Sequence, residues 1–306
     1  MHKSHDKNLR KLTFAEAIRE GIDQAMMDDP NLIVIGEGVP DPKSIFLTTE
    51  GLQEKYGSNR VFDMPLSENG MTGVCTGAAL NGTSVLMVHQ RIEFAMLAMD
   101  QIINNAAKWH YMFNGQSSVP IVIRVIIGRG WGQGPQHSQN LQALFAHIPG
   151  LKVITPATAK DAKGMMISAL KDKNPVIFIE HRWLHHVEDS VPEKIYLSEL
   201  DKAQVLRRGT DVTIVANSLM TIESMKAAEA LSEVGVDVEI VDLRSIKPID
   251  SDTILKSVSK TKKLIVVDSS WKTGGISGEV IASIVERGFD LLEQAPLRIT
   301  SPDHVV

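Results

Sequence analysis

The sequence has almost no cysteine, no membrane-length apolar run and no excess of positive charge. Cys75 is the only cysteine among 306 residues, which excludes an intrachain disulfide and a metal site built from several cysteines. No apolar stretch approaches the roughly 20 residues that cross a bilayer, so no membrane partner is expected. The net charge of −5 lacks the lysine and arginine surplus typical of nucleic-acid binding. The composition is that of an ordinary globular protein.

Several well-known catalytic motifs are also missing. The sequence contains no GxSxG elbow, no HExxH zinc motif, no EF-hand loop and no GxxxxGK[ST] phosphate loop. The first seven residues are polar and hold no apolar signal core, so we predict no secretory signal. With a single cysteine, this favours a reducing, cytoplasmic setting.

Short apolar runs alternate with helical patterns along the first half of the chain. Thr13 and Glu16 form a capping-box pattern, which predicts a helix beginning there. Further helices are expected at residues 97–112 and 160–171. Strands are expected at residues 32–35, 85–88, 120–127, 152–155 and 176–180. This alternation predicts an α/β domain with a mainly parallel sheet.

The alternation of strand and helix patterns stops after residue 185 and resumes further along the chain. We predict a first domain over residues 1–185, a connection over 186–203 and a smaller α/β domain over 204–306. In the second domain, strands are expected at residues 212–216, 236–241 and 264–268, with helices at 220–234 and 275–287.

Three loops of the first domain follow predicted strands, where ligands of parallel sheets bind. The first is Gly36-Glu37-Gly38, in which a glycine-flanked acid meets a ligand or simply lies in a turn. The loop alone favours a turn with a solvated acid.

The second loop leads through Ser67 to Glu68, at the start of a run rich in small residues. Gly73 and Gly77 are one helical turn apart, so we expect another helix to pack closely there. A carboxylate at the start of such a helix is desolvated and suited to proton exchange. Equally, Glu68 only favours the dipole of the helix N-terminus. The pattern supports the two interpretations evenly.

The third loop, residues 128–139, has glycine at four alternate positions and ends near His137. Its glycines permit a close approach of backbone to ligand. His137 is able to bind a ligand or move a proton, although a lone histidine is more often structural. The adjacent pair His185 and His186 is expected at the surface, beside the connection.

An ordered series of motifs then covers nearly the whole chain. Its members are Met64-Pro65-Leu66-Ser67-Glu68, Asp100-Gln101-Ile102-Ile103-Asn104, Gln136-His137-Ser138-Gln139, Pro149-Gly150-Leu151-Lys152-Val153, Asp161-Ala162-Lys163-Gly164, Asp172-Lys173-Asn174-Pro175 and Asp242-Leu243-Arg244-Ser245-Ile246. In this series the chain resembles the β subunit of the heterotetrameric 2-oxoacid dehydrogenase decarboxylating component, the pyruvate, branched-chain and acetoin group. The resemblance implies a parallel-sheet pyrimidine-binding domain followed by a smaller transketolase-type C-terminal α/β domain.

The resemblance also implies a shared cofactor. Thiamine diphosphate in this family is held partly through Mg²⁺ bound to a Gly-Asp-Gly motif, and this sequence has no such motif. An α-type partner chain is therefore expected to carry the motif and the Mg²⁺, in an α₂β₂ assembly with β–β contacts.

The roles of site residues carry over by position. Glu68 matches the acid that hydrogen-bonds the aminopyrimidine nitrogen, and Phe94 matches the aromatic residue near that ring. Gln90 falls in the same stretch and is expected to contact the cofactor. His137 matches a histidine near the substrate and the incoming lipoyl group. Glu37 matches an acid in a tunnel between two active sites. A structural potassium site is implied at Ile121, Ala169, Asp172 and Asn174.

Some positions depart from the family pattern. Arg91 and Glu93 stand in a stretch that is often less polar, and we expect them to influence substrate choice. Arg129 and Trp131 are also unusual.

The activity implied is decarboxylation of a 2-oxoacid, with pyruvate first by family frequency, and transfer of the acyl group to a lipoyl acyltransferase. A split carboligase or transketolase-like enzyme without a lipoyl carrier is the alternative. A degenerate scaffold subunit is a third possibility, against which Glu68, Phe94 and His137 speak.

Overall fold

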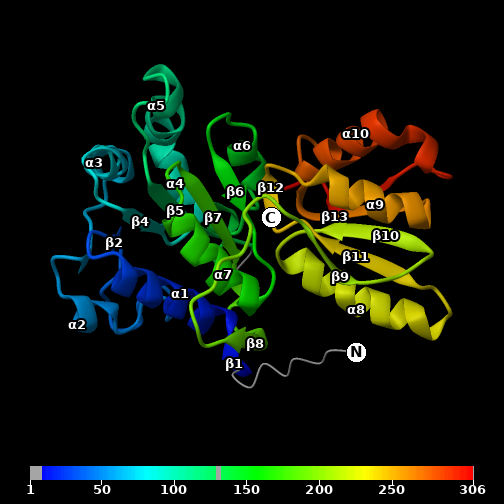
Figure 1. Ribbon diagram of the computed structural model, residues 1–306, viewed down its shortest axis with the longest axis horizontal. Coiled ribbons are helices and arrows are strands. Elements are labelled where there is room, and N and C mark those ends of the chain that lie inside the picture. Colours follow the sequence, from blue (N-terminus) through cyan, green and yellow to red (C-terminus); the bar gives the residue numbers. More distant parts are fainter. Residues whose placement is uncertain (1–8, 129–131, 306) are drawn as a thin grey trace.

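The computed structural model describes residues 9–128 and 132–305, which form two α/β units side by side (Figure 1). The first unit is built on a seven-stranded sheet in the order β12-β6-β7-β5-β4-β2-β3. Its strands pair in parallel except β12, which is antiparallel to β6. They are β2 (Ile33–Gly36), β3 (Val61–Phe62), β4 (Val85–His89), β5 (Ile121–Ile127), β6 (Lys152–Ile154), β7 (Val176–His181) and β12 (Ser245–Lys247).

Both faces of this sheet are covered, which explains why β4 and β5 are mostly apolar and do not alternate between apolar and polar residues. Every residue of β4 and β5 is buried. Helices α1 (Phe14–Asp28) and α7 (Ala159–Leu170) share one apolar core with one face of the sheet. Helix α3 (Glu68–Leu80) packs on the other face, whose core continues into the second unit.

The second unit has a five-stranded sheet in the order β14-β13-β10-β11-β9, antiparallel only at β9. Its strands are β9 (Gln204–Arg207), β10 (Val212–Ala216), β11 (Val238–Asp242), β13 (Leu264–Trp271) and β14 (Leu297–Ser301). Its helices are α8 (Leu219–Glu233), α9 (Ser251–Thr261) and α10 (Ile276–Gly288).

Shorter segments complete the described chain. They are β1 (Leu9–Thr13), α2 (Leu52–Tyr56), α4 (Ile92–Ala95), α5 (Ala107–Met112), α6 (Gln142–Ala146), β8 (Glu188–Pro192), a π-helix at Gln101–Ala106, and 3₁₀ turns at Met96–Ala98, Pro135–His137, Arg182–Leu184 and Phe289–Leu291.

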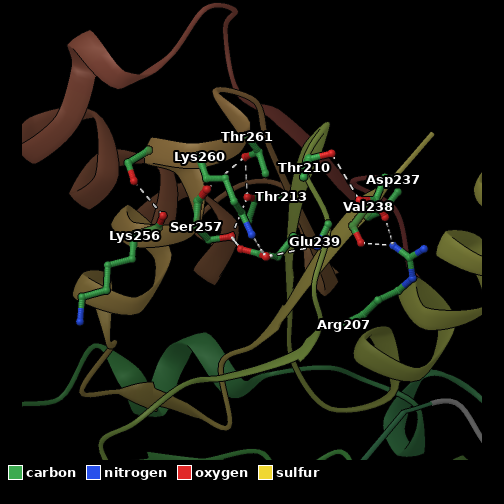
Figure 2. Close-up of polar contacts among 12 residues, drawn as sticks. Arg207, Thr210, Thr213, Asp237, Val238, Glu239, Lys256, Ser257, Lys260 and Thr261 are labelled. Carbon is green, nitrogen blue, oxygen red and sulfur yellow. Dashed lines mark hydrogen bonds and ion pairs between the residues drawn. The ribbon is translucent and has the colours of Figure 1, made fainter. Parts of the chain in front are cut away.

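A polar network inside the second unit ties α9 to the sheet (Figure 2). Ser257 Oγ and Lys260 Nζ donate hydrogen bonds to the carboxylate of Glu239 on β11. Thr213 Oγ1 on β10 lies 2.7 Å from Ser257 Oγ and 2.7 Å from Thr261 Oγ1. Burial alone would raise the pKa of Glu239, but the hydrogen bonds from Lys260 and Ser257 hold it below its ordinary value. The network is thus a structural one whose acid stays ionised.

Local predictions from the sequence are mostly confirmed. The capping box is present, with Glu16 N donating to Thr13 Oγ1 and Thr13 N donating to Glu16 Oε2. The single helix predicted at residues 97–112 is wrong, because the chain there runs through 3₁₀, π and α turns in succession. The predicted connection at 186–203 contains β8, which pairs with β1.

Two further details differ from expectation. Gly73 does permit a close approach, since a Cβ there would lie 3.2 Å from the side chain of Gln101, but Gly77 faces open space. His186 is exposed, as predicted. The prediction that His185 is at the surface is wrong, because His185 is 1% exposed and its ring contacts the rings of Phe14 and Phe46.

Candidate active site

The three loops singled out in the sequence meet at one edge of the first sheet. Strands β2, β4 and β5 are neighbours and run parallel, so their carboxyl ends lie together. Glu37 follows β2, the loop to Glu68 follows β3, which pairs in parallel with β2, and Gly128 follows β5. Gln90 to Phe94 follow β4, between β2 and β5. This is the edge at which open parallel sheets bind ligands.

Two carboxylates lie close together at this edge. Glu68 is the first residue of α3 and is 8% exposed, so the predicted desolvation is confirmed. Glu37 is half-buried, and its Oε1 has no hydrogen-bond partner among the described residues. Burial raises the pKa of Glu37, and the negative charges of Glu68 and Asp63 raise it further. A carboxyl group with a raised pKa, as at Glu37, is suited to holding and exchanging a proton.

Gln90 holds the loop that carries Glu37. Its Nε2 donates to the Glu37 carbonyl over 3.0 Å. Gly38 has a φ of +73°, and its N–H donates to Asp63 Oδ1 over 3.0 Å. A Cβ at Gly38 would lie 3.0 Å from Gln90 Nε2, so glycine is required by both space and conformation. The Gln90 amide nitrogen is therefore directed at this protein loop, and a cofactor contact by Gln90 stays a prediction.

An aromatic residue and a histidine meet at the same edge of the sheet. The rings of Phe94 and His137 are 5.4 Å apart and nearly perpendicular, at 84°. Both side chains are partly exposed. This edge of the sheet thus carries a carboxylate pair, an aromatic residue and a histidine, and their roles stay predictions. Arg129 and Trp131 lie outside the described residues.

The sequence analysis missed two buried histidines behind this site. His89 and His181, which end β4 and β7, are 2% and 5% exposed, and burial lowers the pKa of each to about 4. His181 is packed so tightly that a Cβ at Gly128 would lie 2.1 Å from its Nε2. These histidines are neutral near pH 7 and act as packing groups. Their positions at strand ends were the available signal.

The four residues of the implied potassium site lie at the opposite edge of the sheet. Ile121 begins β5, and Ala169 is near the end of α7. Asp172 N–H donates to the Ala169 carbonyl over 3.1 Å, and Asn174 N–H donates to Asp172 Oδ1 over 2.9 Å. Lys152 Nζ is paired with the other carboxylate oxygen of Asp172. The structure therefore brings Ala169, Asp172 and Asn174 together.

Known proteins match this chain over nearly its whole length. Residues 10–186 match the pyrimidine-binding domain of transketolase, and residues 201–306 match the transketolase C-terminal domain. These matches confirm the predicted fold class. Within the described residues, no helix is long and apolar enough to span a membrane.

The most similar solved folds include a split-gene transketolase in an inactive β4 tetramer and a 2-oxoglutarate:ferredoxin oxidoreductase. The first has a TM-score of 0.76 at 22% identity and covers 95% of this chain and 90% of its own. The second has a TM-score of 0.68 at 13% identity and covers 96% and 62%. Both support the fold.

Curated relatives share about two fifths of their residues with this chain. The pyruvate dehydrogenase E1 component β subunit of Rickettsia felis is 40% identical over 291 residues, which is 95% of this chain and 89% of that protein. The β subunit of acetoin:2,6-dichlorophenolindophenol oxidoreductase from Cupriavidus necator is 41% identical over 305 residues, covering 96% and 90%. The pyruvate dehydrogenase β subunit of Bacillus subtilis is 40% identical over 298 residues, covering 97% and 92%. The chain therefore belongs to the family of 2-oxoacid dehydrogenase E1 β subunits, within the transketolase-like proteins.

Proposed function

We propose that this chain is the β subunit of a thiamine-diphosphate-dependent 2-oxoacid dehydrogenase. Its substrate would be a 2-oxoacid, with pyruvate first, and the acyl group would pass to a lipoyl carrier. The single observation that carries the proposal is the Glu37 and Glu68 carboxylate pair at the same edge of the sheet as Phe94 and His137, within the matched pyrimidine-binding domain.

The residues fit an aminopyrimidine ring. Glu37 Oε1 is buried without a partner among the described residues, and an unpaired buried acceptor favours a ligand that donates a hydrogen bond. Phe94 offers a partly exposed aromatic face against which a flat ring packs. Thiamine diphosphate, when bound, supplies the electron sink for decarboxylation.

The chain's own residues then have separate tasks. Glu68 would hold a proton at the ring nitrogen, because it is buried at a helix start. Glu37 would share that proton exchange, since its pKa is already raised by burial and by Glu68. His137 would act on the substrate side, where it is partly exposed and contacts Phe94.

A partner chain is part of this proposal. The sequence lacks Gly-Asp-Gly, so the diphosphate and its Mg²⁺ would be held by an α-type subunit. Exposed apolar side chains lie on the elements around Glu68 and Phe94: Leu66 is 82% exposed, Val74 61% and Leu97 63%. Exposed apolar groups of this kind mark protein contacts. An α₂β₂ assembly and a lipoyl acyltransferase complete the proposed system.

We predict that the chain alone binds thiamine diphosphate poorly. It would contribute contacts to the pyrimidine ring and none to the Mg²⁺-bound diphosphate, where most of the ligand's charge lies. Isothermal titration calorimetry of the full chain with Mg²⁺ should therefore detect no binding in the micromolar range, with the complex formed with the α-type subunit as positive control. Micromolar affinity without a partner would overturn the two-chain arrangement.

A split carboligase or transketolase-like enzyme is the second candidate. The specific observation that favours it is the pair of polar side chains, Arg91 and Glu93, immediately before Phe94. An assay of the co-expressed complex with 2-oxoacids and an artificial electron acceptor separates the two. Turnover of ketose sugars without 2-oxoacid oxidation would favour the second candidate.

We also propose a structural K⁺ at Ile121, Ala169, Asp172 and Asn174. Carbonyl, carboxylate and amide oxygens are hard ligands, and Asp172 with Ala169 and Asn174 already forms one compact turn. The ion would lie far from the carboxylate pair, because the two occupy opposite edges of the sheet. Its role would be to fix the turn between α7 and β7.

Potassium is accordingly expected to raise the melting temperature. An ion that binds only the native state stabilises it by mass action, about 2.7 kcal/mol at a hundredfold excess over its Kd. Calorimetric scans in potassium chloride and in tetramethylammonium chloride at equal ionic strength test this. The difference should vanish in Asp172→Ala and persist in Asp28→Ala, which removes an exposed ion pair with Lys171. Equal melting in both salts would refute the site.

A further inference from the structure

Arg91 is a buried cation between β4 and α4. It is only 2% exposed, and its Nη1 donates to the Gly128 carbonyl over 3.0 Å. Its Nη2 donates to Gln133 Oε1. Gly128 begins the loop that leads to His137, and Gln133 lies within that loop. Arg91 therefore hydrogen-bonds the N-terminal part of the segment that carries His137.

Glu93, two residues further on, hydrogen-bonds the C-terminal end of the same loop. Its Oε1 accepts the Gln139 N–H over 2.6 Å, while Oε2 is buried without a hydrogen-bond partner among the described residues. Gly128 N–H also donates to the Gln139 carbonyl over 3.4 Å, which closes the base of the loop. The two side chains thus hold residues that pair with each other.

Helix α4 also carries the residue that His137 contacts. Phe94 directly follows Glu93 in α4, and its ring meets that of His137 at 5.4 Å. The loop has little freedom at its base, because Gly128 is packed against His181. A shift of Arg91 or Glu93 would consequently move the backbone on both sides of His137 relative to Phe94.

From this geometry we infer that Arg91 and Glu93 are positioning residues for His137: they clamp both ends of its loop and hold its ring against Phe94. Neither touches the reacting atoms. The inference deepens the proposed function, since it rests on His137 acting at the substrate. It gives the two departures from the family pattern a role in setting loop geometry.

The electrostatics agree with a clamp. Burial raises the pKa of Glu93, and the hydrogen bond from Gln139 and the charges of Arg91 and His137 oppose that rise. Burial lowers the pKa of Arg91, and the charge of Glu93 opposes this. Each group is thus partly compensated by the other.

The substitutions Glu93→Gln and Glu93→Ala distinguish loss of the hydrogen bond to Gln139 from a general loss of stability. Glu93→Gln keeps an oxygen that can accept the Gln139 N–H, whereas Glu93→Ala keeps none. Amide hydrogen exchange of the full chain, followed by NMR, should be roughly tenfold or more faster at Gln139 in Glu93→Ala, and near the parent rate in Glu93→Gln. Gln133→Ala, which removes one exposed acceptor of Arg91, should give an intermediate effect. Glu54→Ala, an exposed position on α2, is the matched control.

A second measurement uses the complex with the α-type subunit. Glu93→Ala should lower acyl transfer as much as His137→Ala does, mainly through kcat, and Glu93→Gln should recover most of it. Unchanged Gln139 exchange in Glu93→Ala, or unchanged acyl transfer in the presence of faster exchange, would overturn the clamp. A complex that lacks 2-oxoacid activity in the parent, while Gln139 exchange still responds to Glu93→Ala, would refute the proposed function and leave the loop contact intact.

Discussion

Replacing Glu68 with glutamine is expected to lower turnover of the assembled complex by about a hundredfold or more, the usual scale for losing a positioned acid–base group. The substitution keeps the size of the side chain and an oxygen that accepts hydrogen bonds. It removes the only group at the start of α3 that can take up and release a proton. Cofactor affinity should stay near normal, because the polar contact to the pyrimidine ring survives.

The decisive measurement is hydrogen–deuterium exchange at the thiazolium carbon of the bound cofactor. Glu68→Gln should slow it strongly, whereas His137→Ala should leave it fast and damage substrate handling or acyl transfer. Glu54→Gln serves as control, since Glu54 is an exposed acid on a different helix, α2. Exchange in Glu68→Gln as fast as in the parent would make Glu68 a helix-dipole acid and refute its assigned role.

The sequence predicted the parts of the fold that follow local periodicity. The strands at β4 and β5 were recognisable because both faces of the sheet are covered, which produces mostly apolar runs, with Arg124 as the one charged residue of β5. The start of α3 at Glu68 was recognisable from the small residues that follow. Because parallel strands end at one edge of a sheet, loops 91 residues apart, at Glu37 after β2 and at Gly128 after β5, were both expected where ligands bind.

Two of the elements that were missed, β1 and β12, depend on contacts distant in sequence. β1 forms only because it pairs with β8, and β12 leaves the second unit to join β6 of the first. Neither has enough apolar pattern of its own. The same holds for His185: a histidine pair beside a predicted connection resembles a surface feature, and only the folded chain supplies the aromatic rings around His185.

The sequence indicated candidate residues for the site, but it did not indicate the contacts that hold them in place. Family resemblance indicated Glu68, Phe94 and His137, and the structure brings Phe94 and His137 into contact. Arg91 and Glu93 were noticed as departures and assigned to substrate choice. Their contacts run instead to Gly128 and Gln139, which no sequence pattern reveals, because a side chain's partner across 37 or 46 positions is set by strand order.

A buried ion pair supports the loop that follows Glu37. Arg124 and Glu180, on the neighbouring strands β5 and β7, are both 0% exposed, and their side chains lie 2.5 Å apart. Arg124 Nη2 also donates to Thr48 Oγ1 over 2.5 Å. Thr48 follows Phe46 and Leu47, which have positive φ values of 51° and 69°, so this loop is costly to hold without an anchor.

Breaking this pair by Glu180→Ala should destabilise the chain by about 3–5 kcal/mol, because it leaves the Arg124 guanidinium buried without its counter-charge. Urea unfolding followed by circular dichroism measures the loss. Glu223→Ala is the matched control, since its pair with Lys226 is on the surface and contributes little. A loss in Glu180→Ala no larger than in Glu223→Ala would mean that Arg124 finds water or another acceptor.

The double replacement Arg124→Met with Glu180→Leu should recover much of that stability, since apolar groups of similar volume need no counter-charge. Acid titration gives an independent check. Burial alone would raise the pKa of Glu180, but the charges of Arg124 and His185 outweigh it and lower the pKa to about 2. An acid with a lowered folded-state pKa stabilises fully above its ordinary value of 4.5, and that contribution is lost as the pH falls toward 2. The double variant should therefore lose less stability than the parent between pH 4.5 and 2. If the free energy of unfolding falls equally in both proteins over this range, Glu180 is not the source of the acid sensitivity.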